Sequence, residues 1–577
     1  MDYLKIDDET KLVKGALMSL LASKADVTIF MPQDVLEMDG NVRINIPSEA
    51  DGNWTFRFKK SDLKKEKYLE LYKMCCQNNR YWGDKMEKFV LAIDQGTTST
   101  RAILFDKFGT PRFKAQREVA LIYPKSGWVE EDAIEVYTSV IDVINELLIR
   151  SNLTLKNIDS IGITNQRETT VIWNKETGLP VCNAIVWQSR QSQEICDALE
   201  DKKDFIKEKT GLVINPYFSA SKIRFILDKY NLQKEAEEGK LLFGTIDSWL
   251  IYKLTLGKVH ATDITNASRT MLFNIFEKKW DDDLLKLFNI PKCMLPSVHE
   301  CSYHYGDATL MFASTTIPIT GVAGDQQASL FGQTCFDKGN IKNTYGTGCF
   351  MLMNIGENPT ISKSGLLTTI AWSINGTTTY ALEGSVFIGG AAIQWLRDEM
   401  KLISKASDSE ISAQKVDDSN GVYVVPAFVG LGTPYWDDQV RGAVFGLTRA
   451  TNKYHFVRAT LEAIAYQSKD LMETIKKDSN IEINQLNVDG GATANNYLMQ
   501  FQSDIIELPI ELPSCLETTA LGAAFFAGLY TGFYKSQEEI KKSRNIEREF
   551  KPSMSHKEVE ERYKKWKIAV EATRVFR

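Results

Sequence analysis

The chain alternates between short apolar runs and longer stretches in which apolar side chains recur every three or four positions. Short runs at 159–164 and 422–426 predict buried strands, and the stretch at 136–149 predicts a helix. A further helix is predicted at 558–575. Its apolar face is formed by Val559, Tyr563, Trp566 and Val570. This mixture indicates an α/β architecture.

One apolar run, at 520–530, is rich in glycine and alanine. It is too short for a membrane span, which takes about 20 residues of helix. We therefore expect a buried helix whose small residues permit close packing, and no membrane-spanning segment.

Two segments set a turn of glycine and hydroxyl residues between apolar strands. The first, at 89–106, has Asp94 near the end of its first strand, and the second, at 341–353, has Thr347 in its turn. Backbone amides and hydroxyls in such turns suit phosphate oxygens, and Asp94 could face Mg²⁺. An ordinary hairpin is the alternative. The repetition suggests a duplicated domain that grips a nucleotide from both sides, although such turns are common.

Three further polar segments follow predicted strands. Arg167 and Glu168 come directly after the strand at 159–164, and they could clamp a polyol or form a surface ion pair. Asp325 stands among small residues, where it could accept a substrate proton or cap a helix. The turn beginning at Gly490 could form a ledge for a purine, with Asn495 nearby.

Composition narrows the function classes. The 577 residues are 43% hydrophobic and 25% charged, with a net charge of -6, which argues against a nucleic-acid partner. The nine cysteines are scattered without zinc-ligand spacing, and the first residues lack the apolar core of a signal peptide. We therefore expect a cytoplasmic protein with reduced thiols. Neither a Walker loop nor the protein-kinase signature set is present.

Together, in this order, the segments closely resemble the glycerol kinases of the FGGY carbohydrate-kinase family. The resemblance runs from about residue 87 to near the C-terminus and includes 123–130, 183–188, 262–274 and 430–437. It implies two actin-like (ribonuclease-H-like ATPase) domains, at 86–335 and 336–577, with the active site in the cleft between them. It also implies phosphorylation of glycerol to sn-glycerol 3-phosphate, with ATP and Mg²⁺ as cofactors, by a homo-oligomer (a dimer or tetramer).

The resemblance assigns roles by position. Asp325 would be the catalytic base, and Asp94 would lie on the Mg²⁺ side. The glycerol-binding set would be Arg167, Glu168, Tyr217, Asp325 and Gln326, with Trp187 and Phe350 as apolar walls. The ATP-binding set would be Thr97, Thr98, Ser99, Arg101, Thr347, Gly390, Gln394, Gly491 and Asn495.

Two alternatives remain: a kinase of the same family for another small polyol or sugar, and a non-catalytic actin-like ATP-binding protein. The intact polyol set argues against the second. Against the first, xylulose kinases of the family carry a Gln-Met-His type turn where this chain has Gln166, Arg167 and Glu168. Residues 307–316 lack the Gly, Lys and Arg of the loop that binds fructose 1,6-bisphosphate in inhibited relatives, so we expect no such inhibition.

Residues 1–85 form an N-terminal extension with no counterpart in glycerol kinases. Its segments at 31–36, 43–47 and 52–57 resemble the C-terminal end of 4-α-glucanotransferases. The barrel that carries the catalytic acids of that family is absent from the sequence, so we expect no glucan transfer. A polar stretch at 77–85 could serve as a linker to the kinase.

Overall fold

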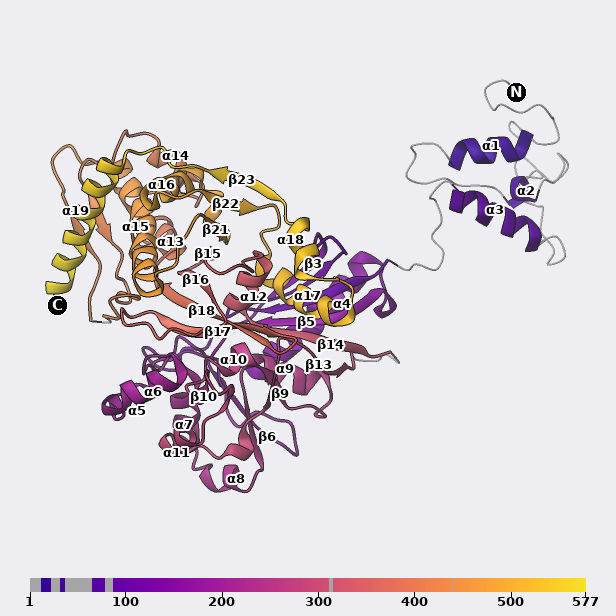
Figure 1. The fold of residues 1–577 in the computed structure, drawn as a ribbon, viewed down its shortest axis with the longest axis horizontal. Helices are drawn as coiled ribbons and strands as arrows, with labels where there is room; N and C mark the ends of the chain where they lie inside the picture. Colours follow the sequence, from indigo (N-terminus) through magenta and orange to yellow (C-terminus); the bar gives the residue numbers. More distant parts are fainter. Residues whose placement is uncertain are drawn as a thin grey trace. The chain divides into compact units, whose positions relative to one another are not determined.

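The computed structural model describes residues 12–21, 32–36, 65–77, 87–310, 315–437 and 439–576. The chain divides into two compact units, Met1–Glu87 and Lys88–Arg577 (Figure 1). In the first unit, α1 (Leu12–Leu21) and α3 (Lys65–Gln77) pack through Leu17, Leu21 and Met74. This unit also contains α2 (Pro32–Val35). Most of the glucanotransferase-like segments, and the predicted linker beyond Gln77, lie outside the described residues.

The second unit begins with a six-stranded sheet. Its strand order is β13 (Ser302–Ala308), β14 (Ile317–Gly324), β5 (Ile158–Asn165), β1 (Phe89–Gln95), β2 (Ser99–Phe105) and β3 (Pro111–Glu118). β1 is antiparallel to β2 and parallel to β5, and β5 is parallel to β14. The hairpin at 89–106 and the buried strand at 159–164 are thus confirmed.

A second, seven-stranded sheet repeats this connectivity. Its order is β17 (Leu367–Ile374), β18 (Thr377–Val386), β16 (Cys349–Gly356), β15 (Ile341–Tyr345), β21 (Leu486–Asp489), β22 (Ile510–Pro513) and β23 (Ile546–Phe550). Here β15 forms a hairpin with β16 and runs parallel to β21, as β1 does with β2 and β5. Two lobes with the same strand plan are what a duplicated actin-like domain predicts.

The predicted helices are present. They are α4 (Ala133–Ser151), α17 (Thr518–Thr531) and α19 (His556–Val575), and in α19 the side chains of Val559, Trp566 and Val570 are buried as expected. The predicted strand at 422–426 is β19 (Tyr423–Val425). No helix among the described residues is long and apolar enough to cross a membrane.

Helix α17 joins the two lobes. It follows β22 in sequence, yet it packs against β1, β5 and β14 of the first sheet and against α12 (Asp325–Gly332). Its Gly522 allows this approach, because a Cβ there would lie 1.9 Å from the carbonyl oxygen of Ala328 in α12. The small residues of the run at 520–530 therefore set the position of α12.

The remaining elements surround these sheets. The helices are α5 (Gln193–Asp197), α6 (Lys203–Thr210), α7 (Ser219–Lys229), α8 (Gln233–Glu237), α9 (Ile246–Leu254), α10 (Ile264–Ala267), α11 (Asp282–Leu287), α13 (Gly390–Asp398), α14 (Asp408–Ala413), α15 (Lys453–Ser479), α16 (Asn496–Ile506) and α18 (Gln537–Ser543). The short strands are β4 (Glu130–Glu131), β6 (Val171–Asn174), β7 (Ala184–Ile185), β8 (Leu241–Gly244), β9 (Ala261–Asp263), β10 (Phe273–Asn274), β11 (Lys279–Trp280), β12 (Ser297–His299) and β20 (Ala443–Phe445).

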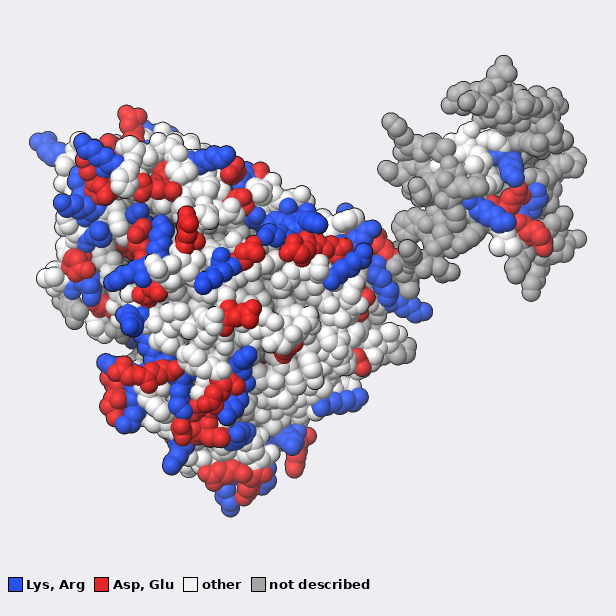
Figure 2. Space-filling model, viewed as in Figure 1, with Lys and Arg blue, Asp and Glu red and all other residues white. Residues whose placement is uncertain are grey.

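Charged side chains of both signs are interspersed on the face of residues 88–577 seen in Figure 2. Long-range attraction of a polyanion needs charge of one sign gathered in one region. The described part of this face does not provide such a region. In the loop at 307–316, where we expect no fructose 1,6-bisphosphate site, residues 311–314 lie outside the described part of the chain.

Candidate active site

The candidate site begins where three parallel strands of the first sheet end in the same row. Gln95 of β1 pairs with Asn165 of β5, and Asn165 pairs with Gly324 of β14. Ligands bind beyond the carboxyl ends of parallel strands in open α/β sheets. This register therefore brings together Asp94, the Arg167–Glu168 pair and Asp325, which are spread over more than two hundred residues of sequence.

The first hairpin closes with a tight turn. The Gly96 amide donates to the Ser99 carbonyl at 2.9 Å, and the turn leaves Thr97, Thr98 and Ser99 at least partly exposed. Arg101 lies opposite Asp94, with Nη1 3.5 Å from Oδ2 of Asp94 and 3.6 Å from Oε2 of Glu517. The hairpin thus presents its hydroxyls and one arginine beside a carboxylate.

Asp94 is the residue of this hairpin that fits a metal ion. Burial raises its pKa to about 6; Arg101 opposes this, while the negative charges of Glu517 and Asp325 add to it. A cation beside Asp94 would stabilise the ionised carboxylate against burial and against these two negative charges. No cluster of three or more His, Cys, Asp or Glu able to hold a metal occurs among the described residues. Mg²⁺ is often held in proteins through one or two carboxylates together with the substrate phosphates, so a single carboxylate such as Asp94 can serve it.

Arg167 is the centre of the predicted polyol pocket, and its guanidinium is engaged on every side. Nη1 and Nη2 donate to Glu383 at 2.7 and 2.9 Å. Nε lies 3.2 Å from Oδ1 of Asp325, and Nη2 lies 3.5 Å from the hydroxyl of Tyr217. Nη1 also donates to Gln327 at 3.2 Å. The predicted glycerol residues Arg167, Tyr217 and Asp325 therefore lie together.

Glu168 is held in a strained position beside Arg167. Its φ of 61° lies in the left-handed region, which costs a non-glycine residue about 1–2 kcal/mol. Its carbonyl accepts from Ser219, and its carboxylate accepts from Nε of Arg269 at 2.6 Å. Strain of this kind concentrates at functional sites, where the surrounding structure stabilises it. Because Arg167 and Glu168 are both buried, they do not form the surface ion pair of the alternative interpretation.

Two residues of this pocket were not predicted from the sequence. Glu383, on β18 of the second sheet, accepts from Arg167 and also from Nη1 and Nη2 of Arg269 at 3.3 and 3.1 Å. All four side chains of this cluster, Arg167, Glu168, Arg269 and Glu383, are buried. Burial raises the pKa of Glu383, but Arg167 and Arg269 outweigh it and lower the pKa to about 2. The cluster is therefore charge-balanced and joins the two lobes.

Asp325 is the first residue of α12, and its carboxylate remains accessible. The side chain is 31% exposed and accepts from the Gln326 amide at 2.7 Å. The helix cap itself is Gly324, so Asp325 is not the N-cap residue. The neighbouring Gln326 accepts at Oε1 from Nζ of Lys342 at 2.6 Å. Burial lowers the pKa of Lys342 to about 8.

Aromatic rings line the pocket. Trp187 and Tyr217 meet edge to face with centroids 5.5 Å apart. Nε1 of Trp187 donates to Thr97 at 2.9 Å, which links this wall to the phosphate hairpin. Nζ of Lys222 donates to the carbonyls of Pro216, Tyr217 and Phe218 and so fixes the segment that carries Tyr217. Phe350 is half-buried on β16.

The predicted ATP residues of the second lobe gather at the ends of β15 and β21. Backbone carbonyls in the turn after β15 accept hydrogen bonds from the start of α13. The Gly390 amide donates to the Gly346 carbonyl at 2.8 Å, and the Ala391 amide donates to the Thr347 carbonyl at 3.1 Å. Gly491 and Gln394 are exposed. Asn495 caps α16 through Leu498 and donates to Ser409. Its amide thus makes one hydrogen bond at each end, and the second Nδ2 hydrogen is left for a further acceptor.

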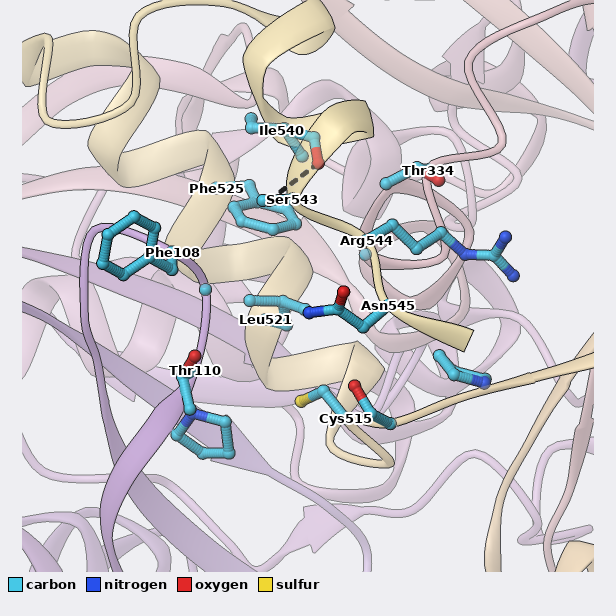
Figure 3. A pocket seen from close by; sticks show the side chains of 15 residues that line it. Phe108, Thr110, Thr334, Cys515, Leu521, Phe525, Ile540, Ser543, Arg544 and Asn545 are labelled. Carbon is cyan, nitrogen blue, oxygen red and sulfur yellow. Dashed lines mark hydrogen bonds between the residues drawn. The ribbon is translucent and has the colours of Figure 1, made fainter. Parts of the chain in front are cut away.

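Figure 3 shows a pocket of about 270 Å³ in another part of this unit. Its walls include Phe108 and Thr110 between β2 and β3, Leu521 and Phe525 of α17, and Asn545 after α18. None of the predicted site residues lines it. The candidate active site is therefore defined by the converging strand ends and not by this pocket.

Comparison with known proteins agrees with this geometry. Residues 89–332 match the N-terminal domain, and residues 341–530 the C-terminal domain, of the FGGY family of carbohydrate kinases. Residues 1–63 match the 4-alpha-glucanotransferase family model.

Curated relatives include a glycerol kinase from Bacillus cytotoxicus, 56% identical over 85% of this chain and 100% of the relative. Another, from Staphylococcus haemolyticus, is 55% identical over 85% of this chain and 99% of the relative. Among solved structures, Plasmodium falciparum glycerol kinase with ADP has a TM-score of 0.79 at 37% identity, covering 84% of this chain and 98% of that one. A gluconate kinase from Lactobacillus acidophilus shares the fold with a TM-score of 0.75 at 23% identity, covering 85% of this chain and 98% of that one. By its strand plan, its two matched domains and its relatives, the chain belongs to the FGGY family of carbohydrate kinases.

Proposed function

We propose that this chain transfers the γ-phosphoryl group of ATP to a terminal hydroxyl of glycerol, giving sn-glycerol 3-phosphate. The observation that carries this proposal is the meeting of Asp325 with Arg167 at 3.2 Å, at the sheet edge that also holds Asp94. The two glycerol kinases described above support the choice of glycerol, because each is matched by this chain over nearly its whole length.

The acceptor hydroxyl would lie beside Asp325. Phosphoryl transfer passes through a loose transition state, so the hydroxyl needs orientation more than early deprotonation. An alcohol is about as weak an acid as water, and a carboxylate is far too weak a base to ionise it in advance. Asp325 therefore accepts a hydrogen bond from the hydroxyl and takes its proton late in the transfer.

The other hydroxyls of glycerol would be bound by Arg167 and Glu168. Most of the Arg167 donors are tightly engaged, but the longer contacts to Asp325 and Tyr217 are the ones a hydroxyl can replace. Tyr217, Trp187 and Phe350 offer apolar surface to the carbon chain, and Gln326 adds an amide. A small polyol satisfies such a pocket because it offers both hydroxyls and CH groups.

ATP would lie between the two hairpins. Thr97, Thr98, Ser99 and Arg101 would bind its phosphates, and Asp94 would hold Mg²⁺, which would offset the negative charge of the phosphates. On the second lobe, the nucleotide would contact Thr347, Gly390, Gln394, Gly491 and Asn495. Proposed in the same way are the domain boundaries at residues 86–335 and 336–577, a homo-oligomeric state and a cytoplasmic location.

Product analysis tests this proposal. The full chain is incubated with glycerol, ATP and Mg²⁺, and the products are followed by ³¹P NMR and by a stereospecific assay for glycerol 3-phosphate. We expect ADP and sn-glycerol 3-phosphate in equal amounts. Release of ADP with no phosphorylated glycerol, or formation of the opposite enantiomer, would refute the assignment.

A further inference from the structure

We infer that Glu383 makes the polyol pocket selective for neutral hydroxyl compounds over anionic ones by occupying the carboxylate-binding edge of Arg167. This inference rests on the proposed function. It concerns a residue on β18 that belongs to no predicted site and that reaches the pocket from the opposite lobe.

The geometry around Arg167 is that of a complete carboxylate complex. Two parallel hydrogen bonds, of 2.7 and 2.9 Å, join Nη1 and Nη2 to the two carboxylate oxygens of Glu383. This paired arrangement is the one by which arginine recognises carboxylate and phosphate ligands. Because Glu383 already fills this Nη1/Nη2 edge, a substrate meets the other edge, formed by Nε and Nη2, where Asp325 and Tyr217 already lie.

The charge of the pocket leads to the same conclusion. Arg167 and Arg269 are matched by Glu168 and Glu383, and Asp325 adds a further negative charge beside Arg167. Other cations near these groups already have hydrogen-bond partners: Lys342 donates to Gln326 and Thr344, Lys222 donates to backbone carbonyls, and Arg101 faces Asp94 and Glu517. A carboxylate entering beside Asp325 and Glu168 would therefore meet repulsion from both, and it would have to displace an existing hydrogen bond to reach a cation.

The fold does not impose this selectivity. A gluconate kinase has the same fold, so this scaffold also accommodates a kinase named for a sugar acid. Discrimination against anions must then come from side chains in the pocket, and Glu383 is a candidate because it holds one edge of Arg167 and is not itself a predicted substrate contact.

The test is Glu383→Gln, which retains the shape of the side chain and removes its charge. Binding of glycerol and of glycerate, a three-carbon hydroxy acid, is measured by calorimetry on the full chain, so that the comparison does not depend on turnover. We expect glycerate affinity relative to glycerol to rise at least about tenfold in the variant. Glu383→Asp retains the charge and should restore most of the discrimination.

A matched control is Glu462→Gln. Glu462 is also buried and paired, with Arg458 at 3.1 Å and Tyr497 at 2.7 Å, but it lies on α15 away from the pocket. Its variant should leave the glycerate-to-glycerol ratio unchanged. If Glu383→Gln does not fold, the charge-balanced Glu383→Gln/Arg269→Met variant replaces it. In that variant too, the affinity for glycerate relative to glycerol should rise.

The inference is wrong if the folded Glu383 variant keeps the wild-type ratio, or if Glu462→Gln shifts the ratio equally. Failure of the proposed function would look different, because the wild-type chain itself would then form no glycerol phosphate. Wild-type activity with glycerol, combined with an unchanged ratio in the variant, would overturn only the role of Glu383.

Discussion

At the scale of single residues, Asp325 carries the chemistry because its carboxylate is both accessible and beside Arg167. We expect Asp325→Asn to lower turnover by about 100- to 10,000-fold, the usual contribution of a positioned base. ATP affinity should change little, because no predicted nucleotide contact is removed. Steady-state turnover and nucleotide binding measure the two effects separately. A variant with near-normal turnover would remove Asp325 from the mechanism.

Removing the charge of Asp94 should raise the stability of the protein and lower its activity. Its pKa is raised from an ordinary 3.8 to about 6, mainly by burial, so the folded protein holds this proton more tightly than the unfolded chain. The stabilisation that comes from the proton is fully present below pH 3.8 and is lost as the pH rises through 6. At neutral pH, ionised Asp94 therefore costs on the order of 2–3 kcal/mol in the nucleotide-free protein.

Asp94→Asn should consequently unfold at a higher temperature than wild type at pH 7.5, while its Mg²⁺-dependent turnover falls sharply. The difference in unfolding temperature between the variant and wild type should shrink towards pH 5, where wild-type Asp94 becomes protonated. Thermal unfolding of the nucleotide-free protein at both pH values measures this. A variant less stable than wild type at pH 7.5 would contradict the account of Asp94.

Sequence reasoning located Asp94, Arg167, Glu168 and Asp325 because each follows or ends a recognisable strand. It missed Glu383 and Arg269 for a physical reason. The importance of Glu383 comes from partners on the other lobe, 216 and 114 residues away in sequence, and nothing local marks a glutamate inside a strand as buried. Single-residue roles that depend on long-range pairing could not be predicted without the fold.

At the scale of elements, periodicity predicted the strands and helices well because each type buries one face or one stripe. The hairpins, β5, α4 and α19 all appear where the pattern placed them. The composition of the run at 520–530 predicted a buried helix, but the bridging role of α17 depends on how two separate sheets meet it. That role could be seen only in the assembled structure.

Gly522 provides a test of α17. A methyl group there would meet the Ala328 carbonyl at 1.9 Å, and α12 carries Asp325 at its start. We expect Gly522→Ala to destabilise the protein by about 1–3 kcal/mol, as overpacking does, and to lower turnover through displacement of α12. Chemical unfolding and kinase assays measure both effects.

Gly376→Ala is the comparison variant for Gly522. It lies in the turn between β17 and β18, where a Cβ would meet open space, although its φ of 82° adds local strain. Its turnover should stay normal. Unchanged stability and turnover in Gly522→Ala would show that α17 and α12 separate easily.

At the scale of the whole molecule, residues 1–87 and 88–577 are separate compact units, and the FGGY domain matches begin at residue 89. Deletion of residues 1–83 should therefore leave kinase turnover and the affinities for ATP and glycerol unchanged. Kinetic comparison of the truncated and full chains checks this. A truncated chain that loses activity would show that the N-terminal unit supports the kinase fold.

The glycerol selectivity of the site at the converging strand ends can be tested with the wild-type chain alone. The most direct test is a comparison of kcat/KM for glycerol, xylulose and gluconate, measured as ADP formation by the full-length wild-type chain with Mg²⁺. We expect kcat/KM for glycerol to exceed both of the other values by at least about 100-fold, because a pocket built around specific hydroxyl contacts rejects poorly matched substrates strongly. Faster turnover of xylulose or gluconate than of glycerol would contradict this expectation.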